Sequence, residues 1–317
     1  MTVLITEPDG YSERAISLYR ETFGEVSLDQ VPVDALESVK VLVVRLAHRL
    51  DESYLSRYPA LQAIVSPTTG LTHINMNVCR ERGIRVLSLA QCKEAIDAVT
   101  STSELTLGLI ISLLRKIPQA NHEVVQQGRW DRDAFRSRQL SSLSLGIIGL
   151  GRIGGHVARY GKALDMSVLA YDPFQPDTRF NELRVCLERN IESMLPQVDI
   201  LTIHAELTSE NHHLIGREEI SLLQPHALVV NTARGALLDE SFAANALRSE
   251  LLAGVAVDVL EDEHSGKTQL ESPLLQAARD GFNIIVTPHV GGCTSDAMHI
   301  TEERMAEVAV SELAHLS

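Results

Sequence analysis

The chain alternates short apolar runs, rich in β-branched residues, with segments of helical length, and this alternation is its most constraining feature. Ten such runs are expected to form strands. They span residues 3–6, 40–44, 61–66, 84–87, 145–148, 167–171, 199–204, 227–231, 254–259 and 283–287. Runs that are apolar on both faces and separated by helices are typical of parallel sheets covered by helices on both sides. The sequence therefore predicts the α/β class.

The ten strands are predicted to divide into two sheets, because 317 residues are enough for about two domains. Residues 101–117 separate them and carry Leu105, Leu109, Leu113 and Ile117 at intervals of four, which predicts one long helix. Its apolar positions are too many for a single stripe, so we expect it to be buried on more than one side, between domains or against another subunit.

Charge and composition narrow the class of partner. The chain has 42 acidic and 28 basic side chains, a net charge of −14, which disfavours nucleic acid. No basic segment precedes the first apolar run, and the most apolar stretch, residues 105–114, is about half the length that spans a bilayer. The 4 cysteines lack metal or disulfide spacing. We expect a cytoplasmic protein without a membrane partner.

The strongest local motif is a glycine-rich turn between an apolar strand and a helical pattern. Gly149, Gly151 and Gly154 form G-x-G-x-x-G. In dinucleotide-binding folds the first glycine makes the tight turn, the second lets pyrophosphate approach the backbone, and the third lets helix and strand pack closely. The alternative is a glycine turn that binds nothing.

An acidic residue ends the strand that follows this turn. Asp172 is in the position where a carboxylate accepts hydrogen bonds from the ribose hydroxyls and repels a 2′-phosphate. Pro173 follows it, where a basic residue would have favoured the phosphorylated cofactor. The register of strand, turn, helix, strand and Asp172 thus predicts NAD rather than NADP.

Three side chains suited to carbonyl chemistry follow three late strands. His289 suits proton transfer, because its side chain titrates near neutral pH. Glu263 would orient the ring and favour its charged form. Arg234 offers a planar fork that binds a carboxylate. Taken singly, each also fits a surface ion pair, a solvated loop or a turn cap.

Together and in this order, these motifs resemble the D-isomer-specific 2-hydroxyacid dehydrogenase family. The resemblance is carried by residues 103–118, 128–130, 146–173, 231–235, 257–263 and 287–292. It implies two Rossmann-like or flavodoxin-like domains with parallel sheets. A central NAD-binding domain, residues 100–291, would be inserted in a discontinuous substrate domain, residues 1–99 and 292–317.

The resemblance also implies a role for each matching residue. His289 would be the acid/base, Glu263 its partner, and Arg234 the ligand of the substrate carboxylate and carbonyl. The backbone of Thr69 and Gly70 would bind the same carboxylate. The cofactor would be bound by Gly149, Gly151, Arg152, Ile153, Gly154, Asp172, His204, Ala205, Thr232, Ala233, Asp258 and Gly291.

The implied function is NAD-dependent interconversion of a small 2-keto acid and its D-2-hydroxy acid, in a homodimer formed through the NAD-binding domain. Two alternatives stay open. One is a dehydrogenase of another small anion, phosphite rather than formate, because formate enzymes usually carry Gln where Glu263 stands. The other is an NAD(H)-sensing regulatory protein of the same fold. The chain also departs from the family at Ala205, where Pro is common, and Glu206 adds a negative charge there.

No metal site is predicted. His212 and His213 are adjacent, and neighbouring residues on a helix or strand point in different directions, so we do not expect them to share an ion.

Overall fold

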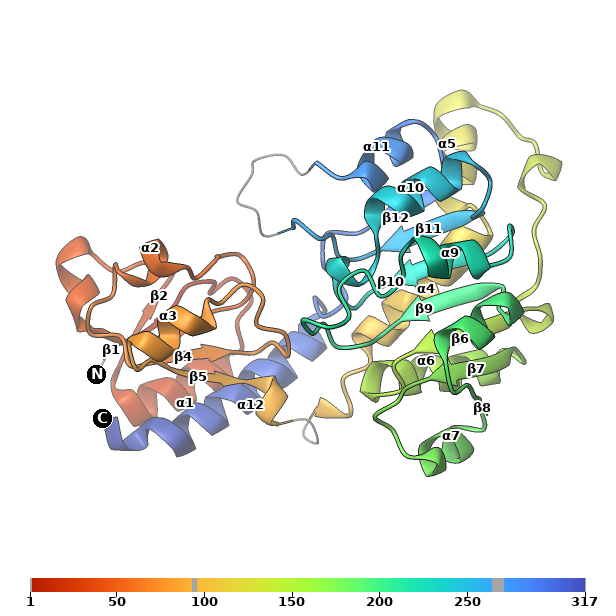
Figure 1. Ribbon diagram of the computed structural model, residues 1–317. Helices are drawn as coiled ribbons and strands as arrows, with labels where there is room; N and C mark the ends of the chain where they lie inside the picture. Colours follow the sequence, from red (N-terminus) through yellow and green to blue (C-terminus); the bar gives the residue numbers. More distant parts are fainter. Residues whose placement is uncertain (1, 93–95, 264–270, 317) are drawn as a thin grey trace. The chain divides into compact units, whose positions relative to one another are not determined.

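The computed structural model describes residues 2–92, 96–263 and 271–316. The chain separates into two units, Met1–Val99 with Cys293–Ser317, and Thr100–Gly292. Each unit is built on one parallel sheet (Figure 1). Among the described residues, no helix combines the length and the hydropathy needed to cross a membrane.

The first unit has a five-stranded sheet with helices on both faces. Its strands, in spatial order, are β2 (Glu25–Leu28), β1 (Thr2–Ile5), β3 (Val39–Val43), β4 (Ala63–Ser66) and β5 (Arg85–Ser88). Its helices are α1 (Glu13–Phe23), α2 (Glu52–Leu55), α3 (Met76–Glu81) and α12 (Ser295–Leu313). Alternate residues of β1 face opposite layers: Val3 and Ile5 pack with α1 and α12, and Leu4 packs with α2 and α3.

The second unit has a seven-stranded parallel sheet. Its spatial order is β12 (Ile284–Val286), β11 (Gly254–Val257), β10 (Leu228–Asn231), β9 (Ile200–Ile203), β6 (Ser144–Ile148), β7 (Ser167–Tyr171) and β8 (Cys186–Leu187). The order reverses between β6 and β9, and open sheets of this kind bind ligands beyond the carboxyl ends of the strands at that point.

The helices of this unit are α4 (Ser101–Leu114), α5 (Ile117–Gln127), α6 (Arg152–Ala163), α7 (Asp177–Leu183), α8 (Ile191–Met194), α9 (Arg217–Leu222), α10 (Glu240–Arg248) and α11 (Pro273–Arg279). All except α5 cover the two faces of the sheet. One core layer joins the sheet to α4, α6 and α7, and the other joins it to α8, α9, α10 and α11.

The predicted α/β class with two parallel sheets is confirmed. Each of the ten predicted strands has a counterpart, with ends that differ by a few residues. The prediction missed β2 and β8. Both are edge strands, and β2 is largely exposed while β8 has only 2 residues, so neither has the apolar run of a buried strand.

The helix predicted over residues 101–117 is present as α4, which begins at the predicted residue and ends earlier than predicted, at Leu114. The structure has α4, a left-handed residue at Lys116 with φ of 49°, and then α5, with Pro118 in its first turn. In a continuous helix Pro118 would lack the N–H for the carbonyl one turn earlier and would clash with it, so the chain breaks and restarts. Within its own unit, α4 contacts α6, β10 and β11. Its expected burial on more than one side, between domains or against another subunit, stays a prediction.

A buried ion pair ties two loops of the first unit to α12. The side chain of Glu302 is 1% exposed and accepts hydrogen bonds from the Ser12 backbone N–H (2.8 Å) and from Nε (3.0 Å) and Nη2 of Arg45. Burial raises the pKa of Glu302, while the Ser12 and Arg45 contacts oppose the rise.

We expect Glu302→Ala to destabilise the protein by about 3–5 kcal/mol, because it leaves the Arg45 charge buried without its partner. Glu307 is a control on the same helix, since it pairs with Arg304 at an exposed position. Glu307→Ala should cost less than about 1 kcal/mol. Urea unfolding measures both, and equal costs would contradict the role given to Glu302.

Candidate active site

The turn between β6 and α6 requires two of its three glycines. Gly149 has a φ of 90°, and a Cβ there would lie 2.7 Å from the backbone carbonyl carbon of His204. A Cβ on Gly154 would lie 2.0 Å from the carbonyl oxygen of Gly149. At Gly151, by contrast, an added Cβ meets no described atom within 4 Å. The backbone is thus tightly packed on the protein side and open where a ligand would approach.

The start of α6 faces that open space. Gly151 is its N-cap and supplies no side chain to the first N–H groups of the helix. Backbone N–H groups and the helix dipole at such an end attract anions, phosphate above all. Arg152 and Ile153, both predicted cofactor contacts, are the first two residues of this helix.

Asp172 lies against the same turn. Its Oδ2 accepts the Leu150 backbone N–H (2.7 Å), and its Oδ1 accepts the Phe174 backbone N–H (2.9 Å). Each carboxylate oxygen can accept a further hydrogen bond. The glycine turn, the unhindered position at Gly151 and the carboxylate of Asp172 therefore lie together, as the sequence predicted. These residues fit the diphosphate and the ribose of a dinucleotide.

His204 follows β9 on the other side of the turn. Its backbone N–H donates to the Ile148 carbonyl (2.7 Å), and both ring nitrogens are buried with no partner among the described residues. Burial lowers the pKa of His204 from 6.5 to about 3, so the ring is neutral at physiological pH. Ala205 also lies against Gly149. These two predicted cofactor residues border the turn.

Asp258, predicted to line the nicotinamide, shapes the loop after β12. Its buried carboxylate accepts hydrogen bonds from Oγ1 of Thr287 (2.5 Å) and from the backbone N–H of Val290 (2.9 Å) and Gly291 (2.8 Å). Its backbone carbonyl accepts the His289 N–H (2.8 Å). The sequence does not indicate that Asp258 holds this loop, because the residues it binds lie about 30 positions further along the chain.

The same loop presents His289 to Glu263. His289 Nδ1 lies 2.9 Å from Glu263 Oε1, and their side chains are 26% and 15% exposed. His289 has a φ of 55°, a left-handed conformation that costs a non-glycine residue about 1–2 kcal/mol. The Asp258 contacts hold it in this conformation.

Arg234 is half-buried near two carboxylates, those of Glu263 and Glu206. Burial lowers the pKa of Arg234, while the charges of Glu263 and Glu206 oppose the shift, so the guanidinium stays charged. Asn231 accepts the Ala233 N–H (3.0 Å) and donates to the Arg234 carbonyl (2.8 Å). Thr232, next in this segment, pairs its hydroxyl with that of Thr106 on α4 (2.9 Å).

Gly235 brings the Arg234 and Glu263 segments into contact. A Cβ on Gly235 would lie 2.1 Å from the Leu260 carbonyl carbon, so only glycine fits there. The Leu260 N–H donates to Glu263 Oε2 (3.3 Å), and the Glu261 N–H donates to the buried Glu240 (2.7 Å). Sequence reasoning missed Gly235 and Glu240, although the Arg-Gly pair after β10 signals a close approach.

Thr69 and Gly70 lie in the first unit, in the loop after β4. Thr68 shapes this loop, because its Oγ1 donates to the Gly70 carbonyl (3.0 Å) and shares a hydrogen bond with Ser66 Oγ (2.8 Å). Among the described residues, no acceptor meets the backbone N–H of Thr69 or Gly70. Their predicted contact with a substrate carboxylate remains a prediction.

Strand order, glycine turn and Asp172 define a dinucleotide-binding α/β unit. Residues 107–291 match the family model described as "D-isomer specific 2-hydroxyacid dehydrogenase, NAD binding domain". The chain belongs to this family. The predictions of the family and of NAD as cofactor are thereby confirmed.

Relatives across the whole chain agree. D-3-phosphoglycerate dehydrogenase of Methanocaldococcus jannaschii is 34% identical over 98% of this chain and 58% of its own length. Hydroxypyruvate reductase of Thermotoga maritima is 30% identical over 91% of both chains. The structure of D-lactate dehydrogenase from Aquifex aeolicus, complexed with NAD and lactic acid, has a TM-score of 0.80 at 26% identity and covers 98% of this chain and 94% of its own. The chain spans about half the length of the phosphoglycerate dehydrogenases that it matches, from 45% to 58%.

The neutral, buried ring of His204 predicts a pH effect on stability. Below pH 6.5 the unfolded chain binds a proton at this position that the folded chain excludes until about pH 3. The free energy of unfolding should therefore fall with decreasing pH, by up to about 1.4 kcal/mol per pH unit from this group.

His204→Asn should flatten this dependence. Urea unfolding of both proteins between pH 7 and pH 4.5 measures the two slopes, with circular dichroism as the check on folding. Parallel slopes would contradict the burial of a neutral imidazole at this position.

Proposed function

We propose that the protein is an NAD-dependent oxidoreductase that interconverts a small 2-keto acid and its D-2-hydroxy acid. The observation that carries the proposal is the pairing of His289 Nδ1 with Glu263 Oε1 at 2.9 Å, with the half-buried, charged Arg234 near Glu263. A general acid, its orienting carboxylate and a cation are the groups that reduction of a keto acid needs from the protein.

His289 would move the proton. With Nδ1–H directed at Glu263, the other ring nitrogen, Nε2, is the one that delivers a proton to the substrate oxygen and recovers it in the reverse direction. Glu263 stabilises the imidazolium and fixes which nitrogen reacts. When bound, the nicotinamide would supply or accept the hydride at the carbon atom of the substrate carbonyl group.

Arg234 would orient the substrate and polarise its carbonyl. The guanidinium presents a planar set of donors that matches a carboxylate, and burial strengthens this contact by excluding water. In the first unit, the backbone N–H groups of Thr69 and Gly70 suit a carboxylate, because they meet no acceptor among the described residues. Glu206, near Arg234, adds a negative charge on the cofactor side.

Cofactor choice would rest on Asp172. A carboxylate beside the glycine turn binds ribose hydroxyls and repels a 2′-phosphate, so NADH should be used in preference to NADPH. The turn, the start of α6, and the segments at residues 204–205, 232–233, 258 and 291 would hold the dinucleotide.

The first experiment is NADH oxidation at 340 nm with a panel of 2-keto acids, from glyoxylate and hydroxypyruvate to branched, aromatic and phosphorylated acids. We expect turnover with NADH and little with NADPH. In His289→Asn, kcat should fall by at least about 100-fold, because the proton donor is lost, while NADH affinity changes little. His226→Asn is the control, an exposed histidine that pairs with Asp199.

Other outcomes separate the alternatives. Reduction of NAD by phosphite or formate, without any keto-acid turnover, would identify a dehydrogenase of another small anion. NADH binding with no turnover of any substrate would favour the NAD(H)-sensing regulator. Full activity in His289→Asn would overturn the catalytic assignment.

We further propose that a second copy of the chain covers an exposed apolar surface on α5. Val124 and Val125 on this helix are 41% and 63% exposed, and Trp130 just beyond it is 88% exposed. Within the described part of the chain, α5 has no buried residue, although it is an amphipathic helix with one apolar face. An apolar surface of this kind on a folded unit marks an interface.

Light scattering tests this interface. The wild-type protein should be a dimer at micromolar concentration, and Val125→Asp with Trp130→Asp should be a monomer with unchanged NADH affinity. Leu222→Asp, at a position 39% exposed on α9, should remain a dimer. A monomeric wild-type protein would contradict the proposal.

A further inference from the structure

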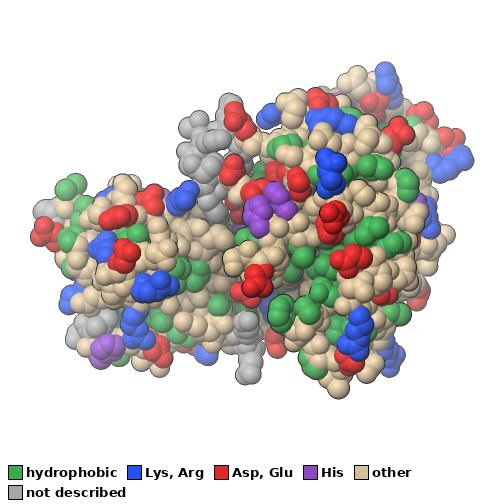
Figure 2. Space-filling view, viewed as in Figure 1, with side chains coloured by type: hydrophobic (Ala, Val, Ile, Leu, Met, Phe, Trp, Pro, Cys, Tyr) green, Lys and Arg blue, Asp and Glu red, His purple; other side chains and the backbone are tan. Residues whose placement is uncertain are grey.

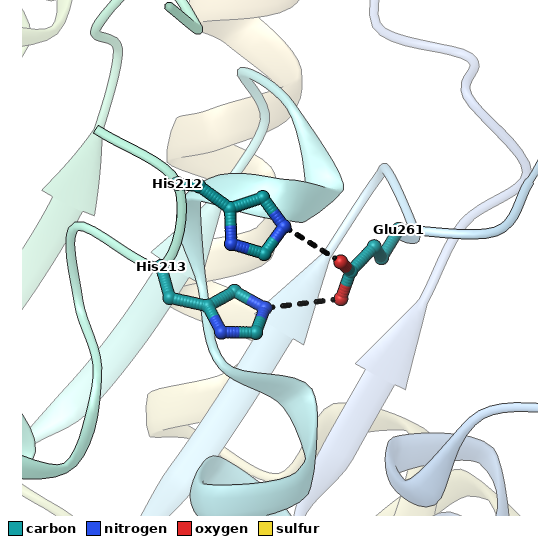
Figure 3. A group of neighbouring side chains, drawn as sticks. All are labelled: His212, His213 and Glu261. Carbon is teal, nitrogen blue, oxygen red and sulfur yellow. Dashed lines mark hydrogen bonds and ion pairs between the residues drawn. The ribbon is translucent and has the colours of Figure 1, made fainter. Parts of the chain in front are cut away.

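Two neighbouring histidines and a glutamate meet at the surface of the second unit. His212 Nε2 lies 2.9 Å from Glu261 Oε1, and His213 Nε2 lies 3.1 Å from Glu261 Oε2. The ring centroids are 4.0 Å apart, and Figure 3 shows both rings directed at the same carboxylate. The pairing of His289 with Glu263 does not use any of these three side chains.

The adjacent histidines converge because their segment is neither helix nor strand. His213 has a φ of 53°, a left-handed conformation that turns its side chain toward the side of His212. Its backbone N–H donates to the Ala236 carbonyl (2.7 Å), which fixes the turn against the segment after Arg234. The expectation that the two rings point in different directions is therefore wrong.

The spacing of the donor atoms suits a metal ion. One ligand atom from each residue lies within 4.8 Å of the other two. In a tetrahedral zinc site with bonds of about 2.0–2.1 Å, ligand atoms stand about 3.3 Å apart. The two histidine nitrogens lie 2.9 and 3.1 Å from different oxygens of Glu261, so both rings and the carboxylate border one position for an ion.

We propose that His212, His213 and Glu261 bind a divalent transition-metal ion of the zinc type, with water completing the coordination. Two imidazoles and one carboxylate are the donor set that zinc, cobalt and nickel prefer, whereas magnesium and calcium require oxygen ligands. Three protein ligands leave one tetrahedral position open.

Charge and access favour a cation at this position. A hollow of about 110 Å³ adjoins the group and is lined by Asp239, Glu240, Asp262 and Glu271 as well. Figure 2 shows histidine side chains at the surface of the molecule with acidic side chains next to them. The side chain of His212 is 55% exposed.

The alternative is a hydrogen-bonded clasp without metal, in which each Nε2–H donates to one carboxylate oxygen. The two differ in the proton on Nε2, since a metal ligand must be deprotonated there. Direct titration with the metal separates them.

The test uses the full chain without an affinity tag, treated with a chelator and then titrated with Zn²⁺ by calorimetry. One equivalent should bind. Titration with Co²⁺ should give the visible absorption bands of a four-coordinate ion. In Glu261→Gln and in His213→Asn, which retains a residue tolerant of left-handed backbone, the dissociation constant should rise by more than about tenfold.

His226→Asn is the matched control, because His226 is likewise exposed and pairs with a carboxylate, Asp199, at 2.9 Å. Its metal affinity should equal that of the wild type. Absence of saturable binding would overturn the proposal in favour of the clasp. Binding that persists unchanged in Glu261→Gln and His213→Asn would also overturn it, since the ion would then sit elsewhere.

Discussion

One buried carboxylate, that of Asp258, fixes the loop on which the proposed chemistry depends. A buried charge is costly unless hydrogen bonds satisfy it, and all three of its side-chain partners lie in the segment from Thr287 to Gly291. These hydrogen bonds hold the loop in place around the carboxylate. That closed loop keeps His289 in a left-handed conformation and directs its ring at Glu263. The proton-transfer geometry therefore rests on a side chain at the end of another strand.

Much of this architecture could be predicted from the sequence, because it depends on local patterns. The glycine turn was identifiable, since Gly149 and Gly154 are required by contacts within one strand–turn–helix segment. Asp172 was identifiable from its place at the end of the next strand. The strands of both sheets were evident where they are apolar on both faces, and the edge strands β2 and β8 were missed because they are not.

The remaining features depend on pairs of residues that are distant in the chain or on backbone conformations that no periodicity encodes. The positive φ of His213 reverses the inference drawn from its adjacency to His212. The left-handed residue Lys116 ends the predicted helix a few residues early, and a separate helix, α5, begins at Ile117 with Pro118 in its first turn. The closeness of Glu206 and Glu263 to Arg234, and the contact of Glu240 with the Glu261 N–H, come from loops that only the sheet brings together. The catalytic roles of His289, Glu263 and Arg234 were predicted from side-chain chemistry and from the family resemblance, and they stay predictions.

The backbone at Gly235 packs directly against the backbone at Leu260, so the segments that carry Arg234 and Glu263 form one rigid unit. With no space for a methyl group between the two backbones, neither segment can shift without the other. A change in one of them should therefore alter the position of the cation and of the carboxylate together. Mutational variation in this protein should accordingly spare these two segments as a unit, and new substrate preferences should arise from residues outside them.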